Sequence, residues 1–149
     1  MIHQISILPA TDDKREAIIA LLQVEKLPVE DLPLSLENFA TAFDGNRVVG
    51  AVGIELYGSY GLLRSLVVDS SYRNHGIAAR LVQAIENKAA ELRLKSIYLL
   101  TETAKEYFDR KGYMVITRED VPEAVKKSSE FSHVCPVSAA VMQKLVLEG

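Results

Sequence analysis

The alternation of apolar and polar residues predicts a strand followed by a helix at the start of the chain. Residues 5–9 alternate apolar and polar side chains, which is typical of a short half-buried strand. Apolar residues then recur at helical spacing from Ile18, which predicts a helix that runs to about Lys26. Asp12 or Asp13 is the expected N-cap of this helix, because a carboxylate there accepts from free amides of the first turn.

Three apolar segments in series then predict antiparallel strands. Segments Phe39–Phe43 and Val48–Tyr57 flank an Asp-Gly-Asn sequence at 44–46, whose residues tolerate positive φ and favour a hairpin. A second turn at Gly58–Gly61 leads into a third apolar segment, Leu62–Val68. The middle of the first half is therefore expected to form three consecutive strands.

The second half begins with the most regular helical pattern of the chain. Apolar residues recur every three to four positions at Ile77, Leu81, Ile85, Ala89 and Leu92. The apolar strand Ser96–Thr101 follows, and a strand-helix-strand passage of this length predicts a parallel strand pair. The remaining expected elements are a helix at Ala104–Lys111, a strand at Tyr113–Thr117, a helix at Pro122–Ser132 and a strand at Ala139–Leu147.

Length and composition favour one folded domain. The 149 residues suit a single domain over 1–149 that buries roughly 70% of the unfolded chain's surface. Hydrophobic residues make up 48% and charged residues 25%, which excludes extensive disorder. The expected architecture is α/β (α+β), with helices flanking a mixed central sheet in the order β-α-β-β-β-α-β-α-β-β.

Charge and cysteine content narrow the classes of partner. With 17 basic and 20 acidic residues the net charge is −3, which argues against a dedicated nucleic-acid binder. A single cysteine, Cys135, excludes an intramolecular disulfide framework. We find no targeting pattern and no apolar run long enough for a membrane span, so a cytoplasmic location without membrane contact is expected.

The segment between the third predicted antiparallel strand and the long helix carries the chemistry. The first amides of a helix lack intrahelical acceptors and lie at the positive end of the helix dipole, so they can receive an anion such as a diphosphate. Gly76 and Ala78 keep the approach free of large side chains, and Arg73 adds a charged donor. The expected anion-binding residues are Arg73, Asn74, His75, Gly76, Ile77 and Ala78.

This segment resembles the acetyl-CoA loop of the GNAT (Gcn5-related) N-acetyltransferases. That loop reads Arg or Gln, two residues, Gly, one residue, then Gly or Ala, and here it is Arg73-x-x-Gly76-x-Ala78. The resemblance extends to the predicted element order and to Ala104–Tyr113, which is similar to the family's second landmark. It implies the GNAT acyl-CoA N-acyltransferase fold, with acetyl-CoA as cosubstrate.

A narrower resemblance points to the GNAT subgroup encoded beside arsenic-resistance genes. Three segments carry it: Gly61–Val68, Tyr98–Ala104 and Cys135–Ala139. We infer no arsenic chemistry from it, because a gene neighbourhood does not specify a substrate.

The family resemblance implies that an amine attacks the acetyl thioester directly in a ternary complex. Pantetheine and the thioester carbonyl are then expected to contact the amides of Leu66, Val67 and Val68, together with Thr101 and Phe108. In the family, the strand that corresponds to Leu66–Val68 is bulged and splays away from the strand that ends here at Thr101. The candidates for removing the amine's proton are Glu102, Glu55 and, through water, Ser65. Glu102 is equally suited to capping the helix that follows it.

Two positions depart from the family pattern. Thr101 occupies a position where the family often has asparagine, so its reach toward pantetheine differs. Phe108 aligns with the tyrosine proposed to protonate the leaving thiolate, and it has no proton to donate. The acid is therefore Ser65, Ser138 or water, or the thiolate leaves unassisted.

For several residues the sequence leaves two alternative roles open. Arg64 and Tyr57 are the candidate acceptor-binding residues, while Arg64 is equally suited to a surface ion pair and Tyr57 to packing beside a turn. Cys135 is either a buried structural thiol or an acetylated nucleophile. The three histidines, His3, His75 and His133, lack metal-ligand spacing, so no metal site is expected.

The sequence thus predicts an acetyl-CoA-dependent N-acetyltransferase of EC class 2.3.1 that acts on a small amine, with amino-acid-like acceptors among the candidates. One rival is a catalytically silent acyl-CoA-binding or regulatory module, which the phenylalanine at 108 favours. Another is an enzyme that acetylates protein N-termini or lysines. A homodimer is one expected assembly, because dimers are common in the family.

Overall fold

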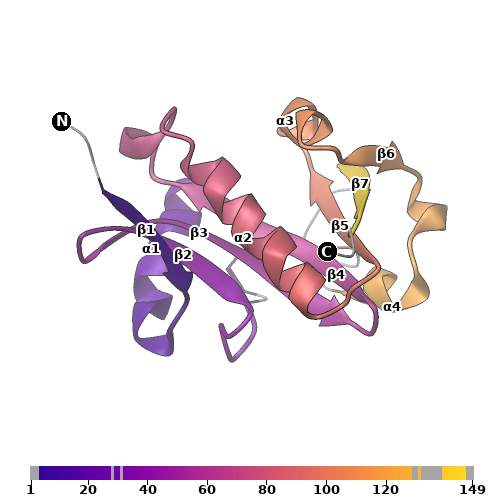
Figure 1. Cartoon of the computed structure of the whole chain (residues 1–149), viewed down its shortest axis with the longest axis horizontal. Coiled ribbons are helices and arrows are strands. Elements are labelled where there is room, and N and C mark those ends of the chain that lie inside the picture. The colour runs from indigo at the N-terminus through magenta and orange to yellow at the C-terminus, as the bar shows by residue number, and fades with distance from the viewer. Residues whose placement is uncertain (1–3, 28, 31, 129–130, 132–138, 147–149) are drawn as a thin grey trace. The chain divides into compact units, whose positions relative to one another are not determined.

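The computed structural model describes residues 4–27, 29–30, 32–128, 131 and 139–146. Its strands and helices follow the predicted order, with one short helix, α4, before the last strand (Figure 1). They are β1 (Ile5–Pro9), α1 (Arg15–Val24), β2 (Phe39–Asp44), β3 (Arg47–Tyr57), β4 (Tyr60–Val68), α2 (Ile77–Glu91), β5 (Ser96–Thr101), α3 (Lys105–Arg110), β6 (Met114–Ile116), α4 (Glu123–Lys126) and β7 (Ala140–Leu145).

The strands form one mixed seven-stranded sheet in the order β1-β2-β3-β4-β5-β7-β6. The β1/β2, β2/β3, β5/β7 and β6/β7 pairs are antiparallel, whereas β4 and β5 pair in parallel over Tyr60–Leu62 and Ser96–Tyr98. The predicted α/β fold and its parallel strand pair are confirmed. The last strand, β7, lies between β5 and β6.

The chain divides into two compact units, each with its own apolar cluster. Unit 1 comprises Met1–Ile54 and Ser65–Lys88, and unit 2 comprises Glu55–Arg64 and Ala89–Gly149. Strands β3 and β4 and helix α2 each contribute residues to both units.

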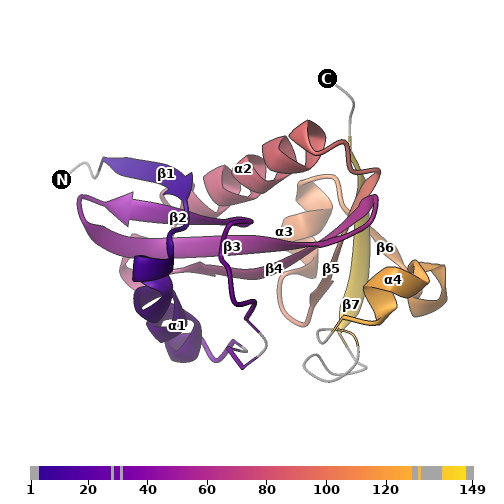
Figure 2. The ribbon, with the colours of Figure 1, turned by 90° about the horizontal axis from the view of Figure 1, so that it is seen from below.

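In unit 1, helices α1 and α2 lie on opposite sides of strands β1–β3 (Figure 2). The apolar face of α1 packs against the strands and the preceding loop through buried residues that include Ile18, Leu22, Leu36, Phe39 and Ala51. On the α2 side the helix approaches β3 closely, since a Cβ added at Gly50 would lie 3.1 Å from Leu81 Cδ1. Unit 1 therefore holds the start of α2 firmly against its strands.

In unit 2, the core residues Leu62, Tyr98, Val121, Val125 and Val141 pack together. They come from β4, β5, β7 and the segment around α4, so this cluster ties α4 to the sheet. Phe108 and Tyr113 add an edge-to-face ring pair at the end of α3, with centroids 5.3 Å apart.

Three local predictions are wrong. Neither Asp12 nor Asp13 caps the first helix: residues 12–14 form a 3-10 turn, Asp13 accepts from the Thr11 hydroxyl, and α1 begins at Arg15 without a side-chain cap. The continuous helix expected at Pro122–Ser132 is absent: α4 spans Glu123–Lys126, residues 127 and 128 are not helical, Phe131 is a π-helical residue, and residues 129, 130 and 132 lie outside the described part of the chain. The long helix ends at Glu91, so Leu92 is exposed rather than part of its apolar face.

Helix α4 is short because its sequence supports a single buried position, Val125. Ser128, two residues after the end of α4, is buried, and its side chain accepts a hydrogen bond from the Phe131 amide. A serine side chain that bonds to the backbone competes with helix continuation. The predicted helix thus lacked the repeated apolar positions that support α2.

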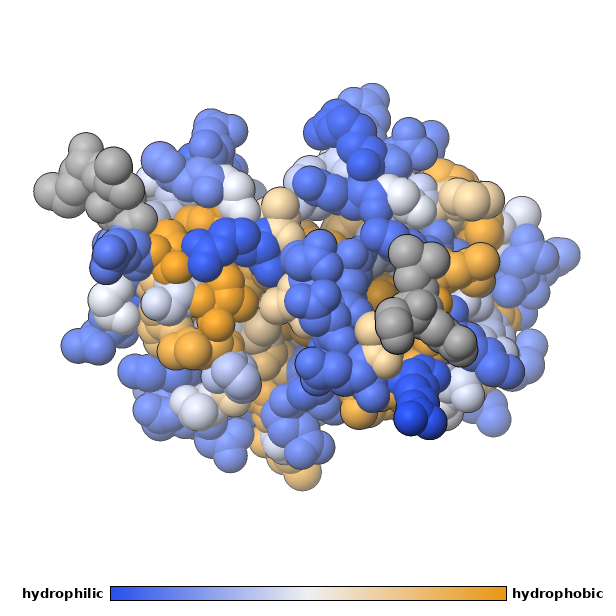
Figure 3. All heavy atoms as spheres, viewed as in Figure 1, coloured by the Kyte–Doolittle hydropathy of each residue, from blue (hydrophilic) through white to orange (hydrophobic). Residues whose placement is uncertain are grey.

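The surface in the view of Figure 3 is mostly hydrophilic, with apolar atoms in separate patches. Of the helices in the described part of the chain, none combines the length and the apolar character that a bilayer crossing requires.

Candidate functional site

The loop between β4 and α2 has the backbone of an anion-binding site. Asn74 and Gly76 both adopt left-handed conformations, with φ of +68° and +74°. The first bond of α2 runs from the Arg80 amide to the Gly76 carbonyl at 3.2 Å, which leaves the first-turn amides without i−4 acceptors inside the helix. Alternating left-handed residues before a helix start turn successive N–H groups toward one point, which suits an anion.

The loop is open to solvent on its outer side. Residues 73–76 are exposed, whereas Ile77 is buried and anchors the helix start in the core. A Cβ added at Gly76 would meet no atom within 4 Å. Packing inside the protein therefore does not require glycine at this position. Glycine is required because the backbone is left-handed there and because a ligand that approaches needs the space.

Arg73 already has an acidic partner. Its guanidinium forms an ion pair with Glu25, at the C-terminal end of α1, and both side chains are partly exposed. Sequence reasoning missed this partner, because the two residues are 48 positions apart. An exposed ion pair of this kind contributes little stability, so its arginine can exchange one anion for another.

Strand β4, which leads into the loop, contains a backbone irregularity. Ser65 lies inside the strand with a left-handed φ of +60°. A serine in this conformation is strained by about 1–2 kcal/mol, which interrupts the regular strand geometry. Past it, Val67 is buried, while Leu66 and Val68 are partly exposed.

The candidate acceptor residues in unit 2 form a polar cluster around one buried arginine. Arg64 has a fully buried side chain, and its Nη1 donates to Glu55 Oε2 at 2.8 Å. The Tyr57 hydroxyl donates to the other oxygen, Glu55 Oε1, at 2.7 Å. The ion pair considered for Arg64 is therefore present, but its arginine is buried instead of lying on the surface, while Glu55 is partly exposed.

Tyr57 stays protonated in this cluster. Burial, followed by the hydrogen bond to Glu55, raises its pKa well above the ordinary tyrosine value. Ser128 is a further hydrogen-bond partner of this side chain, and the sequence offered no signal for it. Both Glu55 oxygens thus accept a hydrogen bond inside the protein, one from Tyr57 and one from Arg64.

The end of β5 presents Thr101 and Glu102. The Thr101 hydroxyl oxygen accepts from the Ala104 amide at 2.9 Å, so Thr101, and not Glu102, satisfies the amide at the start of α3. The capping role considered for Glu102 is therefore wrong. Glu102 is exposed directly after the strand.

Phe108 is a core residue of unit 2. It is 4% exposed and forms edge-to-face pairs with the rings of Tyr107 and Tyr113, with centroid distances of 5.2 Å and 5.3 Å. Lys111 lies over the Tyr107 ring at 5.5 Å. Tyr107 therefore packs against its own helix end.

The candidate residues fall into two groups, one in each compact unit. Unit 1 holds Ser65, Leu66, Val67, Val68 and residues 73–78, and unit 2 holds Glu55, Tyr57, Arg64, Thr101, Glu102 and Phe108. Four other residues from the sequence analysis lie outside the described part of the chain: His3, His133, Cys135 and Ser138. No group of three or more His, Cys, Asp or Glu side chains among the described residues is placed to hold a metal ion.

Comparison with known proteins matches residues 11–113 to the acetyltransferase (GNAT) family. An amino-acid acetyltransferase of Buchnera aphidicola is 25% identical over 100 residues, which cover 66% of this chain and 23% of that protein. An uncharacterized N-acetyltransferase of Bacillus subtilis, YjcF, is 27% identical over 104 residues, which cover 67% of this chain and 74% of that protein.

The fold matches a solved structure over nearly its whole length. N-acetylglutamate synthase from Neisseria gonorrhoeae, solved with coenzyme A and N-acetyl-glutamate, superimposes with a TM-score of 0.83 at 16% identity, over 99% of this chain and 36% of that one. This chain thus spans about a quarter to a third of these longer relatives. The family match covers both the loop at 73–78 and the helix that carries Phe108, and the chain belongs to the acetyltransferase (GNAT) family.

Proposed function

We propose that the chain is an acetyl-CoA-dependent N-acetyltransferase of EC class 2.3.1, which transfers the acetyl group to a small amine. The observation that carries the proposal is the loop at 73–78, where two left-handed residues precede the free amides of α2. Acetyl-CoA has a diphosphate, which is the anion that such a helix start binds well. Solved relatives with bound coenzyme A support the same cosubstrate.

Arg73 and the loop amides would hold the diphosphate together. Its guanidinium pairs with the Glu25 carboxylate in the ligand-free chain, and a diphosphate offers more charge and more acceptor oxygens than one carboxylate. Arg73 would therefore exchange Glu25 for the cofactor. Asn74, His75, Gly76, Ile77 and Ala78 would contribute backbone amides.

The strained Ser65 supports a role for β4 in binding the thioester arm. Strain at a non-glycine residue inside a strand is typical of functional positions. The amides of Leu66, Val67 and Val68, which follow Ser65, are the proposed donors to pantetheine and to the thioester carbonyl. Thr101 would add a donor, since its hydroxyl oxygen accepts from Ala104 and its hydrogen remains available.

Glu102 is the preferred proton acceptor for the attacking amine. It is exposed, whereas both Glu55 oxygens accept hydrogen bonds from Arg64 and Tyr57. Ser65, through water, is the remaining candidate. Phe108 would line the thioester arm without acid chemistry, so water or Ser65 would protonate the thiolate.

An amino-acid-like acceptor is supported by the relatives named for amino-acid acetylation. Tyr57 and Arg64 are the proposed acceptor-binding residues, with Tyr57 as the more accessible of the two. The link to the arsenic-resistance subgroup and the homodimer stay predictions. A silent acyl-CoA-binding module is the second candidate, because Phe108 fills the position of the family's proposed acid.

The direct test is to titrate the protein with acetyl-CoA and to measure thiol release over a panel of small amines and short peptides. We expect saturable binding and thiol release with free amino acids or related amines. Binding without thiol release on any amine would favour the silent module, and a preference for peptides would favour a protein acetyltransferase.

Loop variants show whether the binding uses the proposed residues. Arg73→Ala is expected to weaken acetyl-CoA binding about tenfold, because it removes hydrogen bonds to a charged group. Glu25→Gln is the matched control: it removes the ion pair of Arg73 but keeps the guanidinium, and should bind acetyl-CoA at least as tightly as wild type. Equal affinity of wild type and Arg73→Ala would remove Arg73 from the site.

A further inference from the structure

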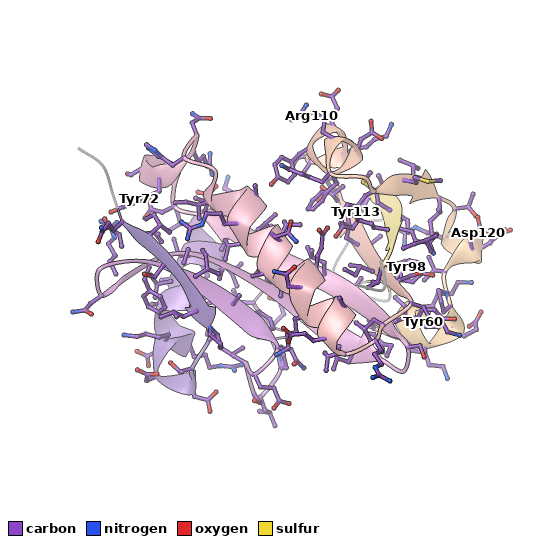
Figure 4. All side chains as sticks on the ribbon, viewed as in Figure 1. Tyr60, Tyr72, Tyr98, Arg110, Tyr113 and Asp120 are labelled. Atoms are coloured by element: carbon purple, nitrogen blue, oxygen red, sulfur yellow. The ribbon has the colours of Figure 1, made fainter. Side chains whose placement is uncertain are left out.

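The residue just before the loop is bonded to a distant hairpin. The Tyr72 hydroxyl donates to Asp44 Oδ2 at 2.6 Å, and Asp44 is the last residue of β2. Tyr72, which is labelled in Figure 4, directly precedes Arg73. Its side chain is 7% exposed. The bond to Asp44 raises the pKa of Tyr72, so the phenol remains protonated and continues to donate.

Arg47, on the other side of the same hairpin turn, bonds to the same segment. Asp44 and Arg47 face each other across the turn between β2 and β3. The Arg47 guanidinium lies 3.1 Å from Asp69 Oδ2 and 5.7 Å from the centre of the Tyr72 ring. Both residues that flank the turn therefore bind the segment that enters the loop.

Asp69 connects these contacts to the backbone. Its Oδ1 accepts from the Ser71 amide at 2.9 Å, and its carbonyl accepts from the Tyr72 amide at 2.8 Å. Its own amide donates to the Val49 carbonyl of β3 at 2.8 Å. The turn at 70–72 is thus fixed at both ends, through side-chain and main-chain bonds.

The β2/β3 hairpin has a β-bulge close to these contacts. The β2/β3 register shifts between Ala42 and Phe43, just before Asp44. Such a bulge changes the direction of the side chains that follow it, and bulges are frequent near active sites. The extra residue is Val49 of β3, because Ala42 pairs with Gly50 and Phe43 with Val48, and the carbonyl of Val49 is the one that accepts from the Asp69 amide.

We propose that Asp44, Arg47, Asp69 and Tyr72, together called the loop brace, are positioning residues that preorganise the loop at 73–78 for the diphosphate of acetyl-CoA. The brace acts on the cofactor through the loop and does not touch it. Residues 73–76 are exposed and include two left-handed residues, and they lie between buried Ile77 on one side and the segment held by the brace on the other. Preorganised amides bind an anion more tightly because less ordering is needed on binding. This inference rests on the proposed function.

The test compares Tyr72→Phe with Tyr98→Phe. Each substitution removes one phenol oxygen from a buried tyrosine, and the Tyr98 hydroxyl bonds to Gln143 rather than to the hairpin. Tyr72→Phe is expected to bind acetyl-CoA about three- to tenfold more weakly, the range for one lost hydrogen bond, with kcat at saturating acetyl-CoA unchanged. Tyr98→Phe is expected to leave the affinity for acetyl-CoA unchanged.

A double-mutant cycle and hydrogen exchange isolate the brace from general stability. Asp44→Ala should weaken binding to a similar extent, and the double variant Asp44→Ala, Tyr72→Phe no further, because both remove the same bond. In the ligand-free protein, Tyr72→Phe should speed amide exchange over residues 74–78, and Tyr98→Phe should not.

The results of these experiments distinguish a failure of the loop brace from a failure of the proposed function. Wild-type affinity and exchange in Tyr72→Phe, or fully additive losses in the double variant, would overturn the brace and leave the proposed function intact. Absence of acetyl-CoA binding by the wild-type protein would overturn the proposed function, and with it the effect of the brace on affinity.

Discussion

Gly76 and Gly58 are two single residues at which the same substitution, glycine to alanine, can be compared. Both have a left-handed φ, +74° and +64°, and a Cβ added at either would meet no atom within 4 Å. Alanine should cost each site about 1 kcal/mol of unfolding free energy, because a left-handed backbone disfavours a side chain. Only Gly76→Ala, in the proposed diphosphate site, should also weaken acetyl-CoA binding, by roughly tenfold, since the backbone approaches the ligand there.

Urea unfolding and calorimetric titration of the two variants check this expectation together. The stability losses serve as the internal control, because they should agree within experimental error. An equal fall in acetyl-CoA affinity for Gly58→Ala would show that the effect arises from general destabilisation, and would count against the loop.

Some features of the candidate site could be predicted from the sequence, and others could not. The place of Gly76 directly before the long helix was predictable, because the regular apolar repeat begins at the next residue, Ile77. The partners of Arg73 and Tyr57 were not, since Glu25 and Ser128 lie 48 and 71 positions away along the chain. Side-chain pairs of that separation depend on the folded chain and leave no local pattern.

At the scale of elements, the pairing of β2 with β3 depends on one glycine. Gly53 lies opposite Phe39, and a Cβ at Gly53 would come within 2.4 Å of the Phe39 ring. Phe39 is 3% exposed and belongs to the core of unit 1, so the ring has little room to move. Gly53→Ala is therefore expected to lower the unfolding free energy by about 1–3 kcal/mol, the usual cost of overpacking.

A second substitution tests whether the ring is the cause. Phe39→Leu in the Gly53→Ala background removes the clashing atoms, so the double variant should lose less stability than the sum of the two single changes. Strict additivity in urea unfolding would indicate that the glycine matters for another reason.

The elements differ in how well the sequence predicts them. Helix α2 was predictable because apolar residues repeat over four turns, from Ile77 to Ala89, and all of them are buried in the structure. The helix expected at Pro122–Ser132 had no such repeat, and its buried Ser128 bonds to the backbone instead. The position of β7 between β5 and β6 was not predictable from local sequence, because it depends on contacts between residues far apart along the chain.

At the scale of the whole molecule, the two compact units share continuous elements. Strands β3 and β4 and helix α2 each have residues in both units, so unfolding one unit interrupts elements of the other. We therefore expect a single cooperative transition in urea, with coincident curves from far-UV circular dichroism and tyrosine fluorescence. Two separated transitions would show that the units are independently stable.

Acetyl-CoA should move that single transition as a whole. A ligand that binds only the folded state stabilises it by about 2.7 kcal/mol when its free concentration is 100 times the dissociation constant. The expected shift of the urea midpoint should therefore appear equally in both optical signals and vanish in Gly76→Glu, whose side chain places a negative charge where the diphosphate binds. A shift that persists in Gly76→Glu would place acetyl-CoA elsewhere on the molecule, because the substitution leaves every surface apart from this loop intact.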